Sequence, residues 1–270
     1  MAELVLRHSE GKVGVVTLNR PEKLNALSMQ MRLDLQKTLE EADEDPDTTV
    51  IVLKANGRSF CVGFDVGGHA TPQPWRHDAL RYHQRLSISM RALSTPWRLR
   101  KPVIASVQGH ALGGGCELSL FCDVTIAADD AIFGEPEILF SQVGPAIIMS
   151  LTIGHKRARE LIYLGEKVNA ATALNLGIVN RVVPAAELEE ATMKYARRMT
   201  LIAPEALAAA KLAISRGAEA QGFNNALNTG VDIFAPLYAA TTEIGRQFEE
   251  IRAKDGLKAA LQWRKRQFDE

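Results

Sequence analysis

The sequence has few cysteines and no excess of charge of either sign. Its 270 residues include only three cysteines, Cys61, Cys116 and Cys122, without a Cys-x-x-Cys pair. This number and spacing argue against a disulfide framework and against a zinc site. The 32 basic and 32 acidic residues give a formal net charge of zero, whereas proteins that bind nucleic acid or anionic membranes carry a basic excess. We therefore expect reduced thiols, no metal and no nucleic-acid partner.

Long apolar runs are also missing. No stretch approaches the roughly 20 residues that span a bilayer, and residues 1–12, MAELVLRHSEGK, lack the apolar segment of a secretory signal. The 46% content of hydrophobic residues is sufficient for a buried core. We expect a folded, cytoplasmic protein that does not enter the membrane.

Strand and helix patterns alternate over the first two thirds of the chain. Short β-branched runs at residues 13–18, 49–54, 102–107 and 123–128 are typical of buried strands. Between the first two runs, Ser28 precedes apolar residues at helical spacing and is expected to cap a helix. From about residue 185 only helical patterns remain, with further helices beginning near residues 204, 221 and 241. The pattern predicts an α/β layered domain followed by a helical tail.

Two glycine-containing segments follow predicted strands. Residues 55–68, ANGRSFCVGFDVGG, come after the strand at 49–54, and residues 110–123, HALGGGCELSLFCD, place three glycines before a short apolar helix. Glycine permits unusual backbone conformations and the close approach of a ligand. The start of a helix presents unpaired N–H groups and a partial positive charge. If both segments leave one sheet, two N–H groups can converge on one oxygen and stabilise an oxyanion.

Together these motifs resemble the crotonase, or enoyl-CoA hydratase/isomerase, superfamily. The resemblance is carried by residues 18–27 (LNRPEKLNAL), 60–66 (FCVGFDV), 101–123, 133–138 (FGEPEI) and 173–184 (ALNLGIVNRVVP). It implies an α/β fold made of a spiral of ββα units, with a C-terminal helical region that drives trimerisation. We expect a core domain over residues 1–195, for CoA binding and catalysis, and a helical region over residues 196–270. The resemblance also implies self-association as a trimer or a dimer of trimers.

The resemblance assigns roles to particular residues. The backbone N–H groups of Phe64 and Gly114 would bind the thioester carbonyl of an acyl-CoA. Glu117 would activate a water molecule, and Glu137 would protonate Cα. The residues matched to CoA-binding positions are Lys23, Leu24, Ala26, Val62, Gly63, Asp65 and Gly113. CoA belongs to the substrate, and no separate cofactor is implied.

The pair of glutamates favours hydration of the double bond. Related isomerases usually keep only one of the two, and two carboxyls in a dry pocket can hold different protonation states. The predicted function is that of an enoyl-CoA hydratase-like lyase of fatty acid metabolism. The alternatives are another acyl-CoA enzyme of the family (an isomerase, hydrolase or decarboxylase) or a non-catalytic CoA-binding protein.

The sequence departs from the family pattern around the second glutamate. Residues 139–154, LFSQVGPAIIMSLTIG, contain Gly144 and Pro145 but no Thr-Gln pair, so we expect a different wall for the acyl pocket. Glu135 adds a third carboxyl where hydratases commonly have Gln. It either raises the pKa of Glu137 by repulsion or points away along an extended backbone, and we favour the second.

The tryptophans, histidines and cysteines near these motifs are not expected to take part in the chemistry. Trp75 and Trp97 either line the substrate tail or belong to the core. Histidines 69, 77 and 83 lack the spacing of a helical metal site and are expected at the surface or over the pocket. Cys61 and Cys116 are expected to be buried apolar filler and not nucleophiles.

Overall fold

The computed structural model describes residues 3–65, 74–144, 147–240 and 242–268, and a six-stranded sheet forms its core. Across this sheet the strands follow the order β1 (Val5–Glu10), β2 (Val13–Leu18), β3 (Val50–Ala55), β4 (Val103–Val107), β6 (Val124–Ala128) and β9 (Arg181–Val183). β1 is antiparallel to β2, and the other neighbours are parallel. The four strands expected from the sequence are confirmed as β2, β3, β4 and β6, the centre of the sheet.

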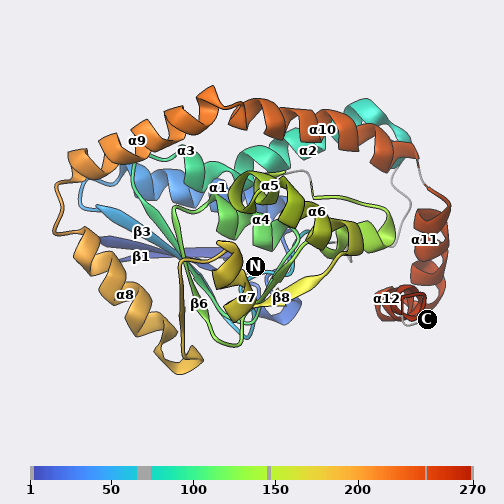
Figure 1. Ribbon diagram of the computed structural model, residues 1–270, viewed down its shortest axis with the longest axis horizontal. Helices are drawn as coiled ribbons and strands as arrows, with labels where there is room; N and C mark the ends of the chain where they lie inside the picture. The colour runs from blue at the N-terminus through green and yellow to red at the C-terminus, as the bar shows by residue number, and fades with distance from the viewer. Residues whose placement is uncertain (1–2, 66–73, 145–146, 241, 269–270) are drawn as a thin grey trace.

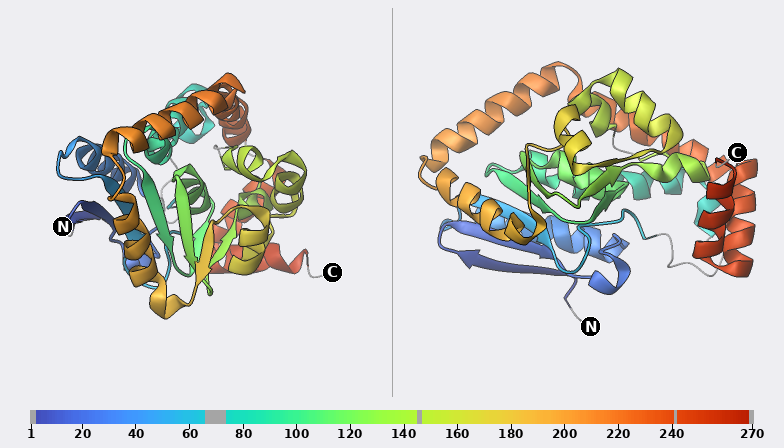
Figure 2. Two further views of the ribbon diagram at one scale, coloured as in Figure 1. Left: turned by 60° about the vertical axis from the view of Figure 1, so that its left-hand side comes forward. Right: turned by 60° about the horizontal axis from the view of Figure 1, so that its bottom comes forward.

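Alternate residues of the central strands pack on opposite faces of the sheet. Val13 and Val15 of β2 belong to a cluster with Leu188 of α8 (Leu188–Met199), whereas Val16 belongs to a larger cluster with Met31 of α1 (Met29–Glu44). The two helices therefore cover opposite faces, as the views in Figures 1 and 2 show. The predicted cap of α1 is confirmed, because Ser28 Oγ accepts a hydrogen bond from the Met31 N–H at 3.2 Å.

A second, three-stranded sheet lies at the edge of the core. It consists of β5 (His110–Leu112), β7 (Ile132–Gly134) and β8 (Lys167–Asn169). The helices between β3 and the tail are α2 (Ala79–Leu93), α3 (Thr95–Arg98), α4 (Gly114–Phe121), α5 (Ile148–Ile153), α6 (His155–Leu164) and α7 (Ala170–Leu176). Short 3-10 turns occur at η1 (Pro21–Lys23), η2 (Pro74–His77), η3 (Pro136–Phe140) and η4 (Ala185–Glu187).

The tail is helical throughout its described part, as the sequence predicts. α9 (Pro204–Ala220) and α10 (Phe223–Ala240) cross the top of the molecule in Figure 1, and α11 (Glu243–Asp255) and α12 (Leu257–Arg266) lie at one end. A buried ammonium anchors α9, because Lys211 Nζ lies 2.7 Å from the Pro96 carbonyl oxygen and 2.7 Å from Asp123 Oδ2. The domain boundary at residues 195/196 stays a prediction. Among the described residues, no helix is long and apolar enough to cross a bilayer.

A buried amide joins the loop before α1 to the loop after β3. The Asn25 side chain donates to the carbonyl oxygens of Asn56 and Ser59, both at 2.9 Å, and accepts from the Arg20 N–H at 2.8 Å. The backbone of Asn25 is left-handed, with φ of 56°, a region that asparagine tolerates better than most residues. Cys61 on the second loop also pairs with Ala111 of β5. These contacts bring the loops together at the carboxyl ends of β3 and β4.

We predict that Asn25→Ala lowers the free energy of unfolding by about 2–4 kcal/mol, because two carbonyls and one N–H lose their buried partner. Urea denaturation of both proteins measures the change. Asn224→Ala, an exposed change on α10, is the control and should stay within about 0.5 kcal/mol of the wild type. Equal stability of the Asn25 and Asn224 variants would contradict the role given to this amide.

Candidate active site

Two of the three consecutive glycines at the start of α4, Gly113 and Gly115, lie where a Cβ does not fit without movement of a neighbour. A Cβ on Gly115 would lie 2.3 Å from the Cys61 carbonyl oxygen, and one on Gly113 would lie 1.8 Å from Glu137 Oε1. Gly113 also has a positive φ of 52°, which disfavours other residues. All of α4 is buried, as the sequence predicts for this short apolar helix. The glycines therefore allow a helix N-terminus to approach both a loop and a carboxyl group.

The loop after β3 packs directly on this turn. A Cβ on Gly63, where φ is 91°, would lie 2.9 Å from the Leu112 carbonyl oxygen and 3.3 Å from the Gly114 nitrogen. The backbone of Leu27 forms hydrogen bonds with Gly63 and Asp65, the residues on either side of Phe64, as in a parallel β-bridge. In this pairing the Phe64 N–H points away from Leu27. The Phe64 ring lies 3.3 Å from the position of a Cβ on Gly114. Phe64 and Gly114, the residues predicted to form the oxyanion hole, are thus neighbours, and their role stays a prediction.

Three carboxyl groups gather beside the glycine turn. Glu117 is fully buried in the first turn of α4, Glu137 lies in η3, and Glu135 is buried between β7 and η3. A Cβ on Gly144 would lie 2.4 Å from Glu117 Oε1 and 3.2 Å from Glu135 Oε2, so both carboxyls face the same glycine. The expectation that Glu135 points away is therefore wrong. The chain leaves β7 and turns into η3 at Pro136, so the alternation of an extended strand ends before Glu137.

Burial raises the proton affinity of two of these carboxyls. It raises the pKa of Glu137 to about 7, and it raises the pKa of Glu135 well above its usual value with a further contribution from the Glu137 charge. Glu135 Oε1 and Glu137 Oε2 are shielded from solvent and have no hydrogen-bond partner among the described residues. Burial therefore favours the protonated form of Glu135, and Glu137 exchanges its proton near neutral pH.

Tyr238 of α10 is a site residue that the sequence does not reveal. Its hydroxyl donates to the Val143 carbonyl oxygen, and the Val143 N–H lies 3.3 Å from the same hydroxyl. Burial raises the pKa of Tyr238 well above its usual value, and the nearby Glu137 and Glu117 add to the shift. Tyr238 thereby holds the residue that precedes Gly144. Its helical spacing from Phe234 indicates the inner face of α10, but the contact with residue 143 cannot be read from the sequence.

The segments predicted to bind CoA form one surface beside Phe64. The carbonyl oxygen of Leu24 accepts the Val62 N–H at 3.2 Å, and that of Ala26 accepts Arg20 Nη1 at 3.0 Å. Arg20 also pairs with Asp65 at 2.6 Å, which ties the first loop to the second. The other assigned residues are Lys23, which is exposed, and Gly63 and Gly113, described above. CoA binding by all of them stays a prediction.

The cysteines behave as buried apolar residues. Burial raises the pKa of the Cys61 thiol to about 12 and that of Cys116 well above its usual value. Only a thiolate is an effective nucleophile. The burial expected of both cysteines is confirmed, and the expectation that they are not nucleophiles stays a prediction.

The two tryptophans have different surroundings. Trp97 stacks on Phe223 at 4.2 Å between ring centroids. Trp75 contacts Tyr82 edge to face at 5.1 Å, and Tyr82 contacts Tyr238 at 5.6 Å, so Trp75 continues an aromatic row toward the carboxyls. His69 and Pro145 lie outside the described residues.

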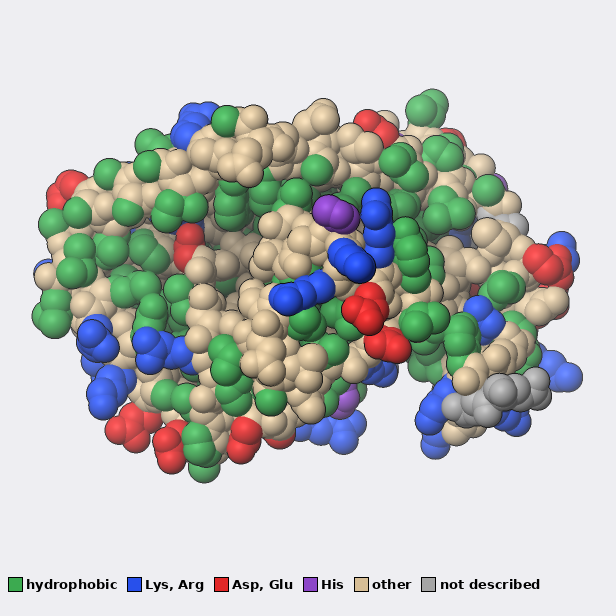
Figure 3. Space-filling model, in the orientation of Figure 1, with side chains coloured by type: hydrophobic (Ala, Val, Ile, Leu, Met, Phe, Trp, Pro, Cys, Tyr) green, Lys and Arg blue, Asp and Glu red, His purple; other side chains and the backbone are tan. Residues whose placement is uncertain are grey.

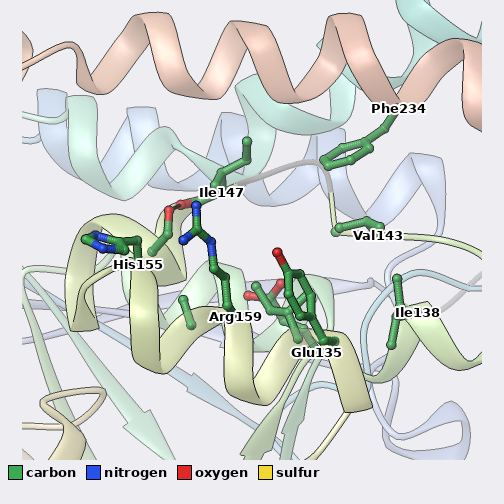
Figure 4. Close-up of a pocket in the computed structure, with 12 residues that line it drawn as sticks. Glu135, Ile138, Val143, Ile147, His155, Arg159 and Phe234 are labelled. Carbon is green, nitrogen blue, oxygen red and sulfur yellow. Dashed lines mark hydrogen bonds between the residues drawn. The ribbon is translucent and has the colours of Figure 1, made fainter.

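A cavity of about 340 Å³ opens beside the carboxyl groups. Its lining includes Glu135, Val143, Gly144, Ile147, Arg159 and Phe234. Figure 4 shows that α6 forms one wall, α10 another, and that Glu135 lies at its base. Gly144, which faces both Glu117 and Glu135, is therefore part of the cavity wall.

Comparisons with known proteins identify the family. The family model described as enoyl-CoA hydratase/isomerase matches residues 8–255. The chain belongs to this family. A short-chain-enoyl-CoA hydratase of Clostridium acetobutylicum is 31% identical over 97% of this chain and 95% of its own length. A probable enoyl-CoA hydratase of Mycobacterium bovis is 35% identical over 80% of this chain and 83% of its own length.

The family fold is also shown by solved structures. An enoyl-CoA hydratase/isomerase from Xanthobacter autotrophicus Py2 superposes with a TM-score of 0.91 at 34% identity, covering 98% of each chain. The α/β crotonase fold expected from the sequence is confirmed. Membership of this family makes the protein an enzyme of the hydratase/isomerase class.

The raised pKa of Glu137 predicts a specific pH dependence of stability. The folded chain holds this proton up to about pH 7, whereas the unfolded chain releases it near 4.5. The contribution of Glu137 to the free energy of unfolding therefore decreases as pH rises from 4.5 to about 7. Glu137→Gln should reduce the loss of stability between pH 5 and pH 8 by about 1–3 kcal/mol.

Urea denaturation at these two pH values measures this change. Glu160→Gln, on the exposed side of α6, is the control and should keep the wild-type pH dependence. The assignment fails if the two variants lose the same free energy between pH 5 and pH 8.

Proposed function

We propose that the protein hydrates 2-enoyl-CoA thioesters, adding water across the α,β double bond. The observation that carries this proposal is the pair of glutamates at one glycine turn. Glu137 Oε1 lies against the Cα of Gly113, and Glu117 lies three residues after Gly114 on the same buried helix. Two carboxyls beside a helix N-terminus are what a proton-transfer reaction at a thioester requires.

The N–H groups of Phe64 and Gly114 are the proposed partners of the thioester oxygen. Attack at Cβ builds negative charge on that oxygen, and the N-terminus of α4 supplies a partial positive charge that opposes it. The N–H of Gly114 is at the first position of α4 and has no acceptor within the helix. The neighbouring Gly113 N–H is already used, because it donates to the Gly134 carbonyl oxygen at 2.8 Å.

The two glutamates divide the proton transfers. Glu117, as the carboxylate, takes one proton from water while the water oxygen forms its bond to Cβ, and the π electrons move onto the thioester as an enolate. Glu137, as the acid, then transfers its proton to Cα and the carbonyl re-forms. The pKa of Glu137 near 7 suits this role, because a substantial fraction stays protonated at neutral pH. One proton must return from Glu117 to Glu137 before the next turnover.

The reaction type, the oligomeric state, the location in the cell and the metabolic role are further parts of this proposal. Isomerase, hydrolase or decarboxylase chemistry would use the same oxyanion site, and the presence of both glutamates favours hydration. A trimer or a dimer of trimers is supported by large apolar side chains that are exposed on α9 and in the turn before it, including Leu201, Leu212 and Ile214. The location in the cytoplasm and a role in fatty acid metabolism stay predictions from the sequence.

Glu117→Gln and Glu137→Gln should each lower the kcat for crotonyl-CoA hydration by about 10²–10⁴-fold, because a proton donor or acceptor is lost while the size of the side chain is kept. The loss of enoyl absorbance measures turnover, and calorimetry with butyryl-CoA should show nearly unchanged binding. The Glu160→Gln control should keep wild-type turnover. Near-normal turnover in both site variants would exclude this mechanism.

Gly114→Pro tests the backbone donor. Proline is tolerated at the first position of a helix but has no N–H, so hydration should fall by about 10²–10³-fold. Gly114→Ala keeps the N–H and places a methyl group 3.3 Å from the Phe64 ring, so it should retain more activity than the proline variant. Circular dichroism and sedimentation confirm that each variant is folded. A folded proline variant with ordinary activity would remove Gly114 from the oxyanion site.

A further inference from the structure

The cavity beside Glu135 combines apolar walls with a histidine and an arginine on one side. Ile138, Ile147 and Phe234 provide apolar surface, while His155 and Arg159 contribute from α6. In Figure 4 both side chains rise from α6 at the side of the cavity opposite Phe234. At roughly 30 Å³ for each water-sized group, its volume of about 340 Å³ has room for a chain of several atoms.

The cations at the start of α6 are not neutralised within the described part of the chain. Residues 155–159 read HKRAR, and the first turn of α6 contains no acidic residue. No ion pair is found for His155, Lys156, Arg157 or Arg159 among the described residues. Cations at a helix N-terminus are repelled by the helix dipole, so this arrangement lowers stability unless an anion binds. Figure 3 shows basic side chains and a histidine grouped over this part of the surface.

We propose that this cavity binds the far end of the acyl group, and that it accepts an acyl chain ending in a carboxylate, held by Arg159 and His155. The inference rests on the proposed function, because Gly144 lines the cavity and also faces Glu117. The reacting carbons would lie on the Glu117 side of that glycine, and the apolar walls would enclose the methylene groups.

The chemistry of the lining agrees with an anionic chain end. A guanidinium binds a carboxylate through two parallel hydrogen bonds, which are stronger than neutral ones. Glu135 is the other ionisable group in the lining besides His155, Arg159 and Tyr163. Burial raises the pKa of Glu135 well above its usual value, which favours the uncharged form and weakens repulsion of an anionic ligand. Arg159 and His155 are both exposed in the unliganded chain, and a chain that ends in a methyl group offers them no hydrogen-bond partner. The subsite therefore favours the carboxylate.

Calorimetric binding of saturated acyl-CoAs tests the subsite without requiring turnover. The probes are 5-carboxypentanoyl-CoA, hexanoyl-CoA and free CoA. The wild type should bind the carboxylate probe about tenfold or more tightly than hexanoyl-CoA. Arg159→Gln should remove this preference. The matched control is Arg157→Gln, an exposed change on the same helix outside the cavity, which should keep the preference.

Each other outcome overturns the proposal. A wild type without preference for the carboxylate shows that the chain end does not meet Arg159. Equal weakening of all three probes by Arg159→Gln shows that the cation binds the CoA phosphates. If Arg159→Gln and Arg157→Gln lose the preference for the carboxylate probe equally, the preference comes from the overall positive charge of α6 and not from contact with Arg159.

Hydration of crotonyl-CoA, measured on the same wild-type sample, tests the proposed function separately. If the protein prefers the carboxylate probe but does not hydrate crotonyl-CoA, the proposed subsite stands and the proposed hydratase function fails. If it hydrates crotonyl-CoA but shows no preference for the carboxylate probe, the hydratase function stands and the subsite fails.

Discussion

Contact between backbone segments that lack side chains is the constraint on which the site depends. Gly63, Gly113, Gly115 and Gly144 each lie where an added Cβ would meet a backbone atom or a carboxyl oxygen at less than 3 Å. These contacts bring the loop after β3, the start of α4, η3 and the segment before α5 into one place. The six-stranded sheet fixes the strand ends from which the loop after β3 leaves, and the buried Asn25 amide bonds to that loop. A methyl group at Gly63 or Gly115 would press on the backbone of the neighbouring segment, and one at Gly113 or Gly144 would displace a glutamate side chain.

The arrangement places three carboxyl groups where water is scarce. Burial of ionised carboxylates is unfavourable, and it raises the pKa of both Glu135 and Glu137. The charge of Glu137 adds to the rise at Glu135. Glu117 lies in the first turn of α4, where the helix dipole favours a negative charge. The stability needed to hold this cluster comes from elsewhere, chiefly from the apolar residues on both faces of the sheet.

The sequence predicts those parts that depend on local pattern. β2, β3, β4 and β6 are β-branched runs, and the cap at Ser28 follows from its position before α1. The three-residue strands β5, β7 and β8 are too short to show a period. The two catalytic candidates and the glycine turn were recognisable as motifs, but the orientation of Glu135 was not, because a turn at Pro136 ends the alternation. Tyr238 was missed since its partner, Val143, is 95 residues away and the contact depends on how α10 docks.

That docking has a consequence for the order in which the protein acquires its site during synthesis. Every residue proposed for proton transfer or for oxyanion binding has left the ribosome long before Tyr238 and Phe234 are added. Until α10 folds over α2, the segment carrying Gly144 lacks its hydrogen bonds to Tyr238, and the cavity lacks the wall that Phe234 provides. A nascent chain that has completed its sheet therefore holds all of the reactive groups in an open, hydrated setting. The proposed acyl cavity is therefore complete only once α10 has been made and has folded.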